Sequence, residues 1–302
     1  MKDLLITHRG EYSKDGITYS NDHQSHLLLG EDGFESIVEI IEKGTIGYLY
    51  TIHDGSGIDF NYILKGKVEF RCGQETQVLI QGDTFSHHAI KENIMFRVIE
   101  DTEFLSISTV QYYDYYQEDQ EHLNDVLNRL QEIDGDTKEH CLRVKKLSMG
   151  IAYFMHYNES SLEDLFFAAN FHDVGKAKIP PEILLKPGKL TDEEYEIMKK
   201  HSTYTYEMIK DYYGEMVAEI AYGHHERLDG RGYPRGIRAD QISLPSRIIC
   251  VADAYDAMTV TRPYHKGLSQ KAALAELHRC EGTQFDGIVI QALEEYLNET
   301  DK

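Results

Sequence analysis

Histidine and aspartate side chains that can bind a metal gather in the second half of this sequence. Some stand in adjacent pairs and others lie alone, and the full set is His140, His172, Asp173, His201, His224, His225 and Asp253. Five imidazoles with two carboxylates suit first-row transition metals, because Mg²⁺ and Ca²⁺ prefer shells made of oxygen alone. A structural zinc site would instead be expected to use closely spaced cysteines.

Asp173 is a natural bridging ligand, since each of its two oxygens can bind a different metal. Two divalent metals about 4 Å apart supply a water nucleophile and hold both oxygens of a phosphoryl group during an in-line displacement. The donor set therefore indicates phosphoester hydrolysis at a binuclear centre. The alternative is that these histidines are separate core or helix-cap residues. We accept that alternative for His156 and His278, which stand on apolar helical spacing without partners. It is weaker for His224-His225, since consecutive helical residues point about 100° apart and burying both is costly.

Apolar spacing from Thr137 onward predicts an all-α domain that positions these ligands. One helix is opened by a capping box at Thr191, where a glutamate follows three residues later, and runs towards Tyr212. The other expected helices cover residues 142–154, 162–171, 216–225, 242–258 and 269–280, with a last one from residue 286. His172-Asp173 then lies at the end of an apolar helix, facing the interior.

The first part of the chain has a different pattern. Short alternating runs with turn residues between them predict strands near residues 34–41, 46–52, 62–72 (broken at Lys65-Gly66), 78–80 and 94–109 (turning at Glu100-Asp101). Several short, closely spaced strands indicate an all-β sandwich or barrel. Residues 111–134 then predict a polar helix with one apolar stripe, Leu123, Leu127, Leu130 and Ile133. The stripe packs on its own domain or forms a signalling or dimer helix.

Composition limits the classes of partner. The 302 residues suffice for two domains, and the net charge of −21 argues against nucleic-acid polymers and anionic membranes, whose binding depends on Lys and Arg. The cysteines Cys72, Cys141, Cys250 and Cys280 show no C-x-x-C spacing and indicate reduced thiols. We see neither a signal peptide nor a membrane helix, and expect a cytoplasmic protein.

The second half resembles the HD-GYP family of HD phosphohydrolases. The motifs are His172-Asp173-Val174-Gly175-Lys176, residues 184–190, His201, His224 through Pro234, residues 251–259 and Arg262-Pro263-Tyr264. This resemblance implies an HD-type helical bundle over residues 135–302 and cyclic dinucleotide phosphodiesterase activity, usually on cyclic di-GMP. It implies two Fe or Mn ions held by the seven ligands named above, with Asp173 bridging. The family can bind a third metal through a Glu at the position of Asp136. Whether Asp136 binds a metal or is a solvated carboxylate stays open.

The same resemblance implies the substrate contacts. Lys176 and Arg262 would hold phosphate oxygens, and Tyr233-Pro234 would contact guanine or a partner such as a diguanylate cyclase. His265 stands where the family has Lys or Arg, so we expect either compensation by Lys266 or reduced affinity, because His is only partly charged near neutral pH.

The first 110 residues resemble a cupin domain, through residues 62–70 and Gly82-Asp83-Thr84-Phe85. The His-x-His of metal-binding cupins is missing. His53, His87 and His88 could gather on one metal, but surface or hydrogen-bonded histidines are the favoured interpretation. We therefore expect a metal-free β domain at residues 1–110 for sensing or homodimerisation, a linker helix at 111–134 and the helical domain at 135–302.

These patterns predict hydrolysis of cyclic di-GMP to pGpG, and GMP if the product rebinds, under control of the β domain. Two alternatives stay open. One is hydrolysis of another cyclic dinucleotide such as cyclic GMP-AMP, and the other is a receptor or partner-binding module that does not hydrolyse its ligand.

Overall fold

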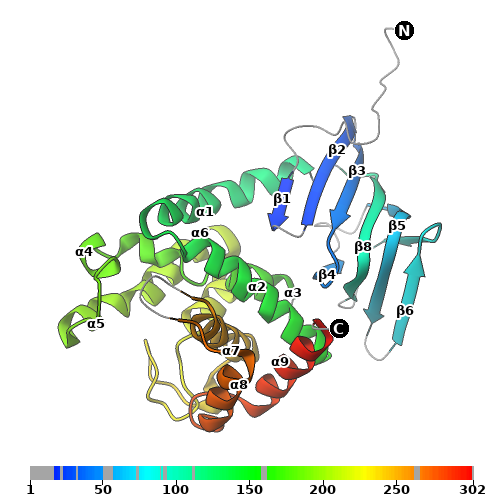
Figure 1. Cartoon of the computed structure of the whole chain (residues 1–302). Coiled ribbons are helices and arrows are strands. Elements are labelled where there is room, and N and C mark those ends of the chain that lie inside the picture. The colour runs from blue at the N-terminus through cyan, green and yellow to red at the C-terminus, as the bar shows by residue number, and fades with distance from the viewer. Residues whose placement is uncertain are drawn as a thin grey trace. The chain divides into compact units, whose positions relative to one another are not determined.

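A computed structural model describes residues 17–20, 23–31, 33–49, 57–72, 75–88, 90, 94–110, 113–157, 162–261 and 266–300. The chain divides into two compact units, residues 1–120 and 121–302. The eight strands of the described residues lie in the first unit, and the helices that carry the expected metal ligands lie in the second (Figure 1). No helix in the described part of the chain is long and apolar enough to span a membrane.

The first unit is built on one antiparallel sheet. Its strands are β1 (Ile17–Ser20), β2 (His23–Glu31), β3 (Phe34–Ile41), β4 (Ile46–Leu49), β5 (Asp59–Cys72), β6 (Glu75–Ile80), β7 (Thr84–His87) and β8 (Ile94–Ser108). They pair in the order β1-β2-β3-β8-β5-β6, while β4 pairs with β8 and β7 with β5 (Figure 1). The described pairings form an open path from β1 to β6. The predicted β fold is thus confirmed as an antiparallel sheet.

The two longest strands continue where the sequence predicts interruptions. Lys65-Gly66 lies within β5, and Glu100-Asp101 lies within β8. The register between these strands shifts in this region, as expected of β-bulges. Gly66 has a φ of +92°, and a Cβ there would lie 2.3 Å from the Asp101 carbonyl oxygen. The chain therefore crosses a bulge that needs glycine, and does not turn back.

The apolar core of this unit lies where β5 and β8 pass the bulge. It contains Ile41, Ile63, Val68, Phe96 and Val98, with Leu49, Phe70, Leu79 and Phe104 packed against it. β3 buries Glu35, Ile37, Glu39 and Ile41 on one face, and Val38 of the opposite face is buried as well. Successive side chains of a strand point to opposite faces, so both faces of β3 are covered in part.

The second unit is helical. Its elements are α1 (Tyr113–Asp134), which begins in the first unit, α2 (Thr137–Phe154), α3 (Leu162–Phe171), η1 (Val174–Lys178), α4 (Pro181–Leu184), α5 (Asp192–Met198), α6 (Lys200–Tyr222), η2 (Ala239–Gln241), α7 (Leu244–Thr259), α8 (Gln270–Arg279) and α9 (Gly287–Thr300). α2 packs against α3, α7 and α9, while α6 packs against α3 and η1. These contacts surround the turn between α3 and η1.

Most helix predictions hold. The stripe residues Leu123, Leu127 and Leu130 are at most 1% exposed, but Ile133 at 51% is not part of the buried face. The capping box at Thr191 is present, although α5 ends at Met198, and α6 continues through a kink at Gly214, where φ is +81°. The expected break between a helix ending near Tyr212 and one beginning at Met216 thus coincides with the kink at Gly214, whereas the break between α5 and α6 at Lys199 was not expected. The domain boundaries at residues 110 and 134 stay predictions.

Candidate metal centre

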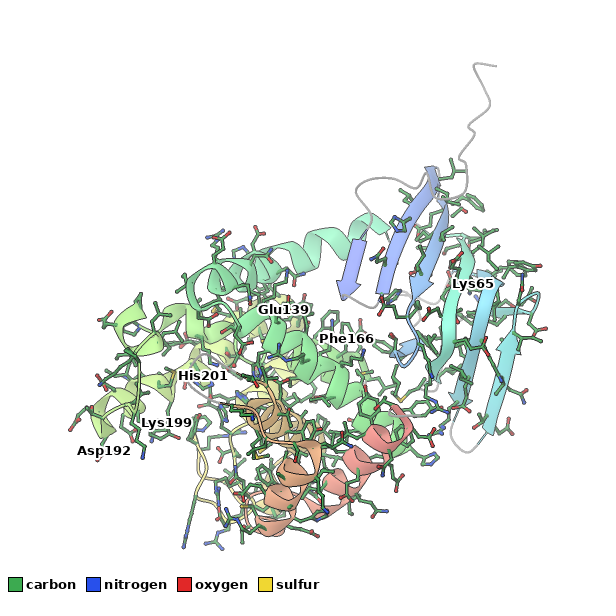
Figure 2. All side chains as sticks on the ribbon, in the orientation of Figure 1. Lys65, Glu139, Phe166, Asp192, Lys199 and His201 are labelled. Atoms are coloured by element: carbon green, nitrogen blue, oxygen red, sulfur yellow. The ribbon has the colours of Figure 1, made fainter. Side chains whose placement is uncertain are left out.

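The ligand set predicted from the sequence comes together in the helical unit. His140 lies on α2, His172 and Asp173 lie in the turn after α3, and His201 lies in the first turn of α6 (Figure 2). His224 and His225 follow the end of α6, and Asp253 lies on α7. Five of these residues are almost fully buried, namely His140, His172, Asp173, His201 and His224. Residues far apart in the sequence therefore form one buried polar centre.

Two groups of ligand atoms share one carboxylate. His140, His172 and Asp173 form one group, and Asp173, His201, His224 and His225 form the other, with the ligand atoms of each group within 4.8 Å of one another. Asp173 Oδ2 lies 3.6 Å from Nε2 of both His140 and His172. Asp173 Oδ1 lies 3.4 Å from His201 Nε2. Each oxygen of Asp173 thus faces a different group, as a bridging carboxylate requires.

A second carboxylate reaches a histidine of each group. Asp253 Oδ1 lies 3.2 Å from His140 Nε2, and Asp253 Oδ2 lies 3.9 Å from His225 Nδ1. Asp253 is therefore placed beside both groups.

Backbone carbonyls orient three of the imidazoles. Nδ1 of His172, His201 and His224 lies 2.8, 2.8 and 2.5 Å from the carbonyl oxygen three residues earlier. A carbonyl accepts only, so each Nδ1 carries the proton and each Nε2 is left with its lone pair. Such a partner on the far nitrogen is the usual support of a metal-binding histidine. The helix ends thus present three Nε2 atoms as ligands.

Orphaned polar atoms test whether metals fit this centre. His172 Nε2, His224 Nε2 and Asp173 Oδ1 are buried and have no hydrogen-bond partner among the residues that the structure describes. Each such atom costs about 1–3 kcal/mol when it stays unsatisfied. All three belong to the two ligand groups, so bound cations would satisfy all of them. The residues present fit a binuclear transition-metal site.

The charge states also suit metal binding. Burial lowers the pKa of both His201 and His224 to about 4, so both imidazoles are neutral at pH 7. Burial alone would raise the pKa of Asp173, but Lys176 and the surrounding histidines outweigh burial and hold that pKa well below its usual value. His201 and His224 therefore offer neutral nitrogens and Asp173 an ionised carboxylate, which are the forms that bind metals.

Asp256 and Arg143 support His140, and the sequence alone assigned neither a role. His140 Nδ1 lies 2.7 Å from Asp256 Oδ2. Arg143 donates to both Asp256 oxygens, at 2.6 and 3.0 Å. Burial lowers the pKa of His140, but hydrogen bonds to Asp253 and Asp256 outweigh it and raise that pKa to about 9. The only available signal was the spacing, because Asp256 stands one helical turn after Asp253 on α7.

Asp136, the candidate ligand for a third metal, lies elsewhere. Its Oδ1 accepts a hydrogen bond from Arg143 Nη2 at 3.0 Å. Among the described residues Asp136 belongs to neither ligand group. The structure thus joins Asp136 to the centre through Arg143 and Asp256.

Lys176 points at the bridging carboxylate. Its Nζ lies 2.6 Å from Asp173 Oδ2, and although burial disfavours the charge, Asp173 raises the pKa of Lys176. The turn that carries both residues lies directly on α6. A Cβ on Gly175 would lie 2.2 Å from the His201 carbonyl oxygen. The Thr205 hydroxyl accepts from Gly175 N at 2.9 Å and donates to the His172 carbonyl at 3.0 Å.

The loop at Gly232-Tyr233-Pro234 (the Gly-Tyr-Pro loop) lies beside the second ligand group. The Tyr233 ring is 4.7 Å from the His225 ring and 6.2 Å from the His201 ring. Tyr233 N donates to the His225 carbonyl at 3.2 Å. A Cβ on Gly232 would lie 2.5 Å from Arg227 N and from the His225 carbonyl. Tyr233 thus lies beside two of the clustered histidines, and the role of Tyr233-Pro234 as a contact surface stays a prediction.

Glu226 fixes the far side of this loop. Its carboxylate is buried and accepts hydrogen bonds from the backbone N–H groups of Arg235, Gly236 and Ile237 at 2.7, 3.2 and 3.1 Å. The sequence signal was its place directly after His224-His225. Backbone partners nine to eleven residues away cannot be read from a motif.

Several predicted residues lie apart from the centre or outside the description. Arg262, His265 and His53 are not among the described residues. Lys266 is exposed. In the β unit, His87 Nδ1 lies 3.4 Å from Asp59 Oδ2, and His88 Nδ1 lies 2.8 Å from the Gly57 carbonyl.

Comparison with known proteins gives the family. The model of the "HD domain" family matches residues 115–289 of this chain. The chain belongs to this family, as its sequence predicts, and its relatives are those of the HD-GYP branch.

Similar curated proteins cover the same kind of domain. A "Cyclic di-GMP phosphodiesterase" of Thermotoga maritima is 41% identical over 172 residues, which are 56% of this chain and 47% of the relative. The "Cyclic di-GMP phosphodiesterase response regulator RpfG" of Xanthomonas campestris pv. campestris is 32% identical over 226 residues, 74% and 57% of the two chains. "3'3'-cGAMP-specific phosphodiesterase 1" of Vibrio cholerae is 38% identical over 170 residues, 53% and 39%. The chain thus spans between 39% and 57% of the length of these relatives.

The N-terminal region matches solved cupin structures. An RmlC-like cupin from Shewanella frigidimarina is 12% identical with a TM-score of 0.31, over 37% of this chain and 96% of that chain.

Proposed function

We propose that this protein is a metal-dependent phosphodiesterase that hydrolyses cyclic di-GMP to linear pGpG, and pGpG to GMP when the product rebinds. The observation that carries this proposal is the pair of ligand groups that share Asp173. A carboxylate with one oxygen toward each group is what a binuclear hydrolytic centre needs.

The metal ligands in this proposal are those predicted from the sequence. His140, His172 and Asp173 would hold one ion, and Asp173, His201, His224 and His225 the other, with Asp253 beside both. Nitrogen-rich ligands favour transition metals over Mg²⁺, the resemblance to the HD-GYP family implies Fe or Mn, and a third ion stays open. When bound, the metals would supply Lewis acidity at the scissile phosphate and a water nucleophile at neutral pH.

The side chains around the ligands have separate tasks. Asp173 orients the centre, and Lys176 Nζ, 2.6 Å from it, carries a positive charge to a non-bridging phosphate oxygen. Arg262, with its planar fork, would hold the second phosphate, and Lys266 would replace the charge that His265 lacks. Tyr233, beside His225 and His201, offers a ring face to a guanine base or to a docked partner.

Substrate choice is the finer part of the proposal. The similar curated proteins include enzymes named for cyclic di-GMP and others named for 3'3'-cGAMP. We favour cyclic di-GMP, and keep 3'3'-cGAMP as the alternative substrate. A receptor that binds without hydrolysis is the alternative from another class, and the orphaned ligand atoms argue against it.

Chromatographic product analysis tests the proposal. The full chain, loaded with Mn²⁺ or Fe²⁺ under anaerobic conditions, is incubated with cyclic di-GMP and in parallel with 3'3'-cGAMP. We expect pGpG to form from cyclic di-GMP faster than linear product forms from 3'3'-cGAMP. Faster cleavage of 3'3'-cGAMP would make that dinucleotide the preferred substrate in place of cyclic di-GMP. Tight binding of either dinucleotide without product would favour the receptor.

We further propose that the β unit regulates this activity, through a ligand or through dimerisation. Deletion of residues 1–110 should then change the oligomeric state or the basal rate. Sedimentation analysis and the same product assay measure both, and no change in either would contradict the regulatory role.

A further inference from the structure

The β unit buries a row of polar side chains across one face of its sheet. In strand register, Glu35 of β3 stands opposite Ser108 of β8, Ser108 stands opposite Asp59 of β5, and Asp59 stands opposite His87 of β7. Directly paired residues point to the same face of a sheet. These four residues, Glu35, Ser108, Asp59 and His87, form the polar row.

The polar row is enclosed by protein. Glu35, Ser108 and Asp59 are 2%, 1% and 6% exposed. The neighbouring row on the same face adds Ser106 and Asn61, which are 6% and 3% exposed. The apolar core residues Ile41 and Ile63 begin farther along the same strands. One end of this face is thus apolar, and the other is lined by acceptors and hydroxyls.

Asp59 is not satisfied by its surroundings. Within the described part of the chain its Oδ1 is buried without a hydrogen-bond partner, and its Oδ2 lies 3.4 Å from His87 Nδ1. Glu39, on the same face of β3, is a contrast, because Oε2 of Glu39 accepts a hydrogen bond from Ser25 and lies 2.8 Å from His23 Nε2. The sheet therefore completes one buried carboxylate and leaves an oxygen of the other open.

The charge at Asp59 has no compensating cation in the described surroundings. Burial lowers the pKa of His87, while Asp59 raises it by less, so the imidazole is neutral at pH 7. A buried carboxylate without a countercharge is costly, and it persists in proteins where a cation or hydrogen-bond donors complete it.

The spacing of the polar row excludes a single metal ion held by its carboxylates. Glu35 and Asp59 lie two strands apart, which is roughly 10 Å at the spacing of a β-sheet. The groups of described residues that can hold a metal both lie in the helical unit. A ligand that reaches across Ser108 must be a molecule of several atoms.

We propose that the polar row is a binding site for a small organic cation that carries a primary ammonium or guanidinium group. The cationic group donates to Asp59 Oδ1, and its remaining donors or its second charge reach Ser108 and Glu35. This inference does not depend on the proposed phosphodiesterase activity, because none of these residues belongs to the helical unit.

Calorimetric titration of the full metal-loaded chain tests the proposal, with putrescine and agmatine as probes. Butane-1,4-diol has the length of putrescine without its charge, and succinate has the opposite charge. We expect saturable binding of at least one cation to one site per chain, and none of the diol or succinate. Binding of the diol as tight as that of putrescine, or no saturable cation binding, would overturn the site.

Three variants locate the binding. Asp59→Asn removes the charge but keeps the shape, and it should weaken cation binding by about tenfold or more, as expected for a charge-assisted hydrogen bond. Glu75→Gln removes an exposed carboxylate of β6 and should leave binding unchanged, which controls for nonspecific attraction to an acidic protein. Ser106→Val adds bulk to the neighbouring row and should abolish cation binding. It tests the site independently if Asp59→Asn fails to fold. Equal affinities in all three folded variants would contradict the proposal.

Discussion

Asp173 in the helical unit and Asp59 in the β unit are both buried aspartates, but their surroundings differ. Asp173 faces Lys176 and three imidazoles, and these charges and dipoles hold it ionised. Asp59 faces one neutral imidazole. Each keeps an oxygen without a hydrogen-bond partner among the described residues. The imidazole nitrogens around Asp173 are the metal ligands that we propose, whereas the groups around Asp59 are mostly acceptors. The same buried side chain therefore belongs to a metal centre in one unit and to a cation site in the other.

The largest expected effect comes from removing the shared carboxylate. Asp173→Ala takes a ligand from both groups, so turnover of cyclic di-GMP should fall by far more than about 100-fold, the upper range for losing a mere supporting residue of a metal site. Bound metal, measured by elemental analysis, should fall with it. Asp211→Ala, an exposed carboxylate on α6, is the matched control. Full activity in Asp173→Ala would refute the site assignment.

A smaller loss, of metal affinity, is expected at Asp256, which contacts a proposed ligand and not the metals. Asp256→Asn leaves His140 without its charged partner, and metal affinity should fall by roughly 10–100-fold. Competition with a metal chelator measures this affinity independently of turnover. Arg143→Lys keeps a charge beside Asp256 and should lose less. If Asp256→Asn changed only the melting temperature, Asp256 would be a structural residue.

The histidines of the metal centre make the folding stability of the metal-free protein depend on pH. His201 and His224 have a pKa of about 4 in the folded chain against 6.5 unfolded, so the unfolded chain binds more protons between these values and stability falls as the pH drops. His140, with a folded pKa of about 9, acts in reverse, and its contribution is lost as the pH rises from 6.5 to 9.

Urea unfolding after metal removal should therefore show greatest stability near pH 6.5. The double variant His201→Gln, His224→Gln should flatten the acid side of this profile. A profile that keeps its acid slope in the double variant would assign the slope to other groups.

The smallest effect is expected at Asp59. Without a bound cation, Asp59→Asn removes a buried charge with an open oxygen, and the free energy of unfolding should rise by about 1–3 kcal/mol. Glu75→Gln, on the surface, should change it by less than about 0.5 kcal/mol. Chemical denaturation measures both, and a loss of stability in Asp59→Asn would mean that its charge is already compensated.

The sequence allowed prediction of a buried cluster of histidines and aspartates, and its role as a metal centre stays a proposal. His172-Asp173 and His224-His225 stand in short local patterns, and the resemblance to the HD-GYP family indicated which of the other residues would join them. Asp256 could not be assigned in this way, because its partner His140 lies 116 residues away on another helix. The task of Glu226 depends on backbone groups of a loop whose path no motif describes.

In the β unit, too, contacts between residues far apart in the sequence could not be predicted. The run from Phe34 to Ile41 predicted a strand but not which of its side chains face inward, and the polar row also needs the register of β8 and β5. That register shifts at the bulge around Gly66, and a slip of one residue would turn Asp59 to the other face. The pairing of β3, β8 and β5 places Glu35, Ser108 and Asp59 side by side. The sequence of one strand alone does not determine this pairing.

The Thr205 hydroxyl has a consequence for the energetics of metal loading. By bonding both Gly175 N and the His172 carbonyl, it locks the turn of His172, Asp173 and Lys176 onto the helix that carries His201. Ligands from two segments are therefore preorganised, and the entropy of arranging them is lost when the chain folds, not when ions arrive. Part of the cost of assembling the ligands is thus met in the folded metal-free chain, by a hydroxyl that belongs to neither ligand group.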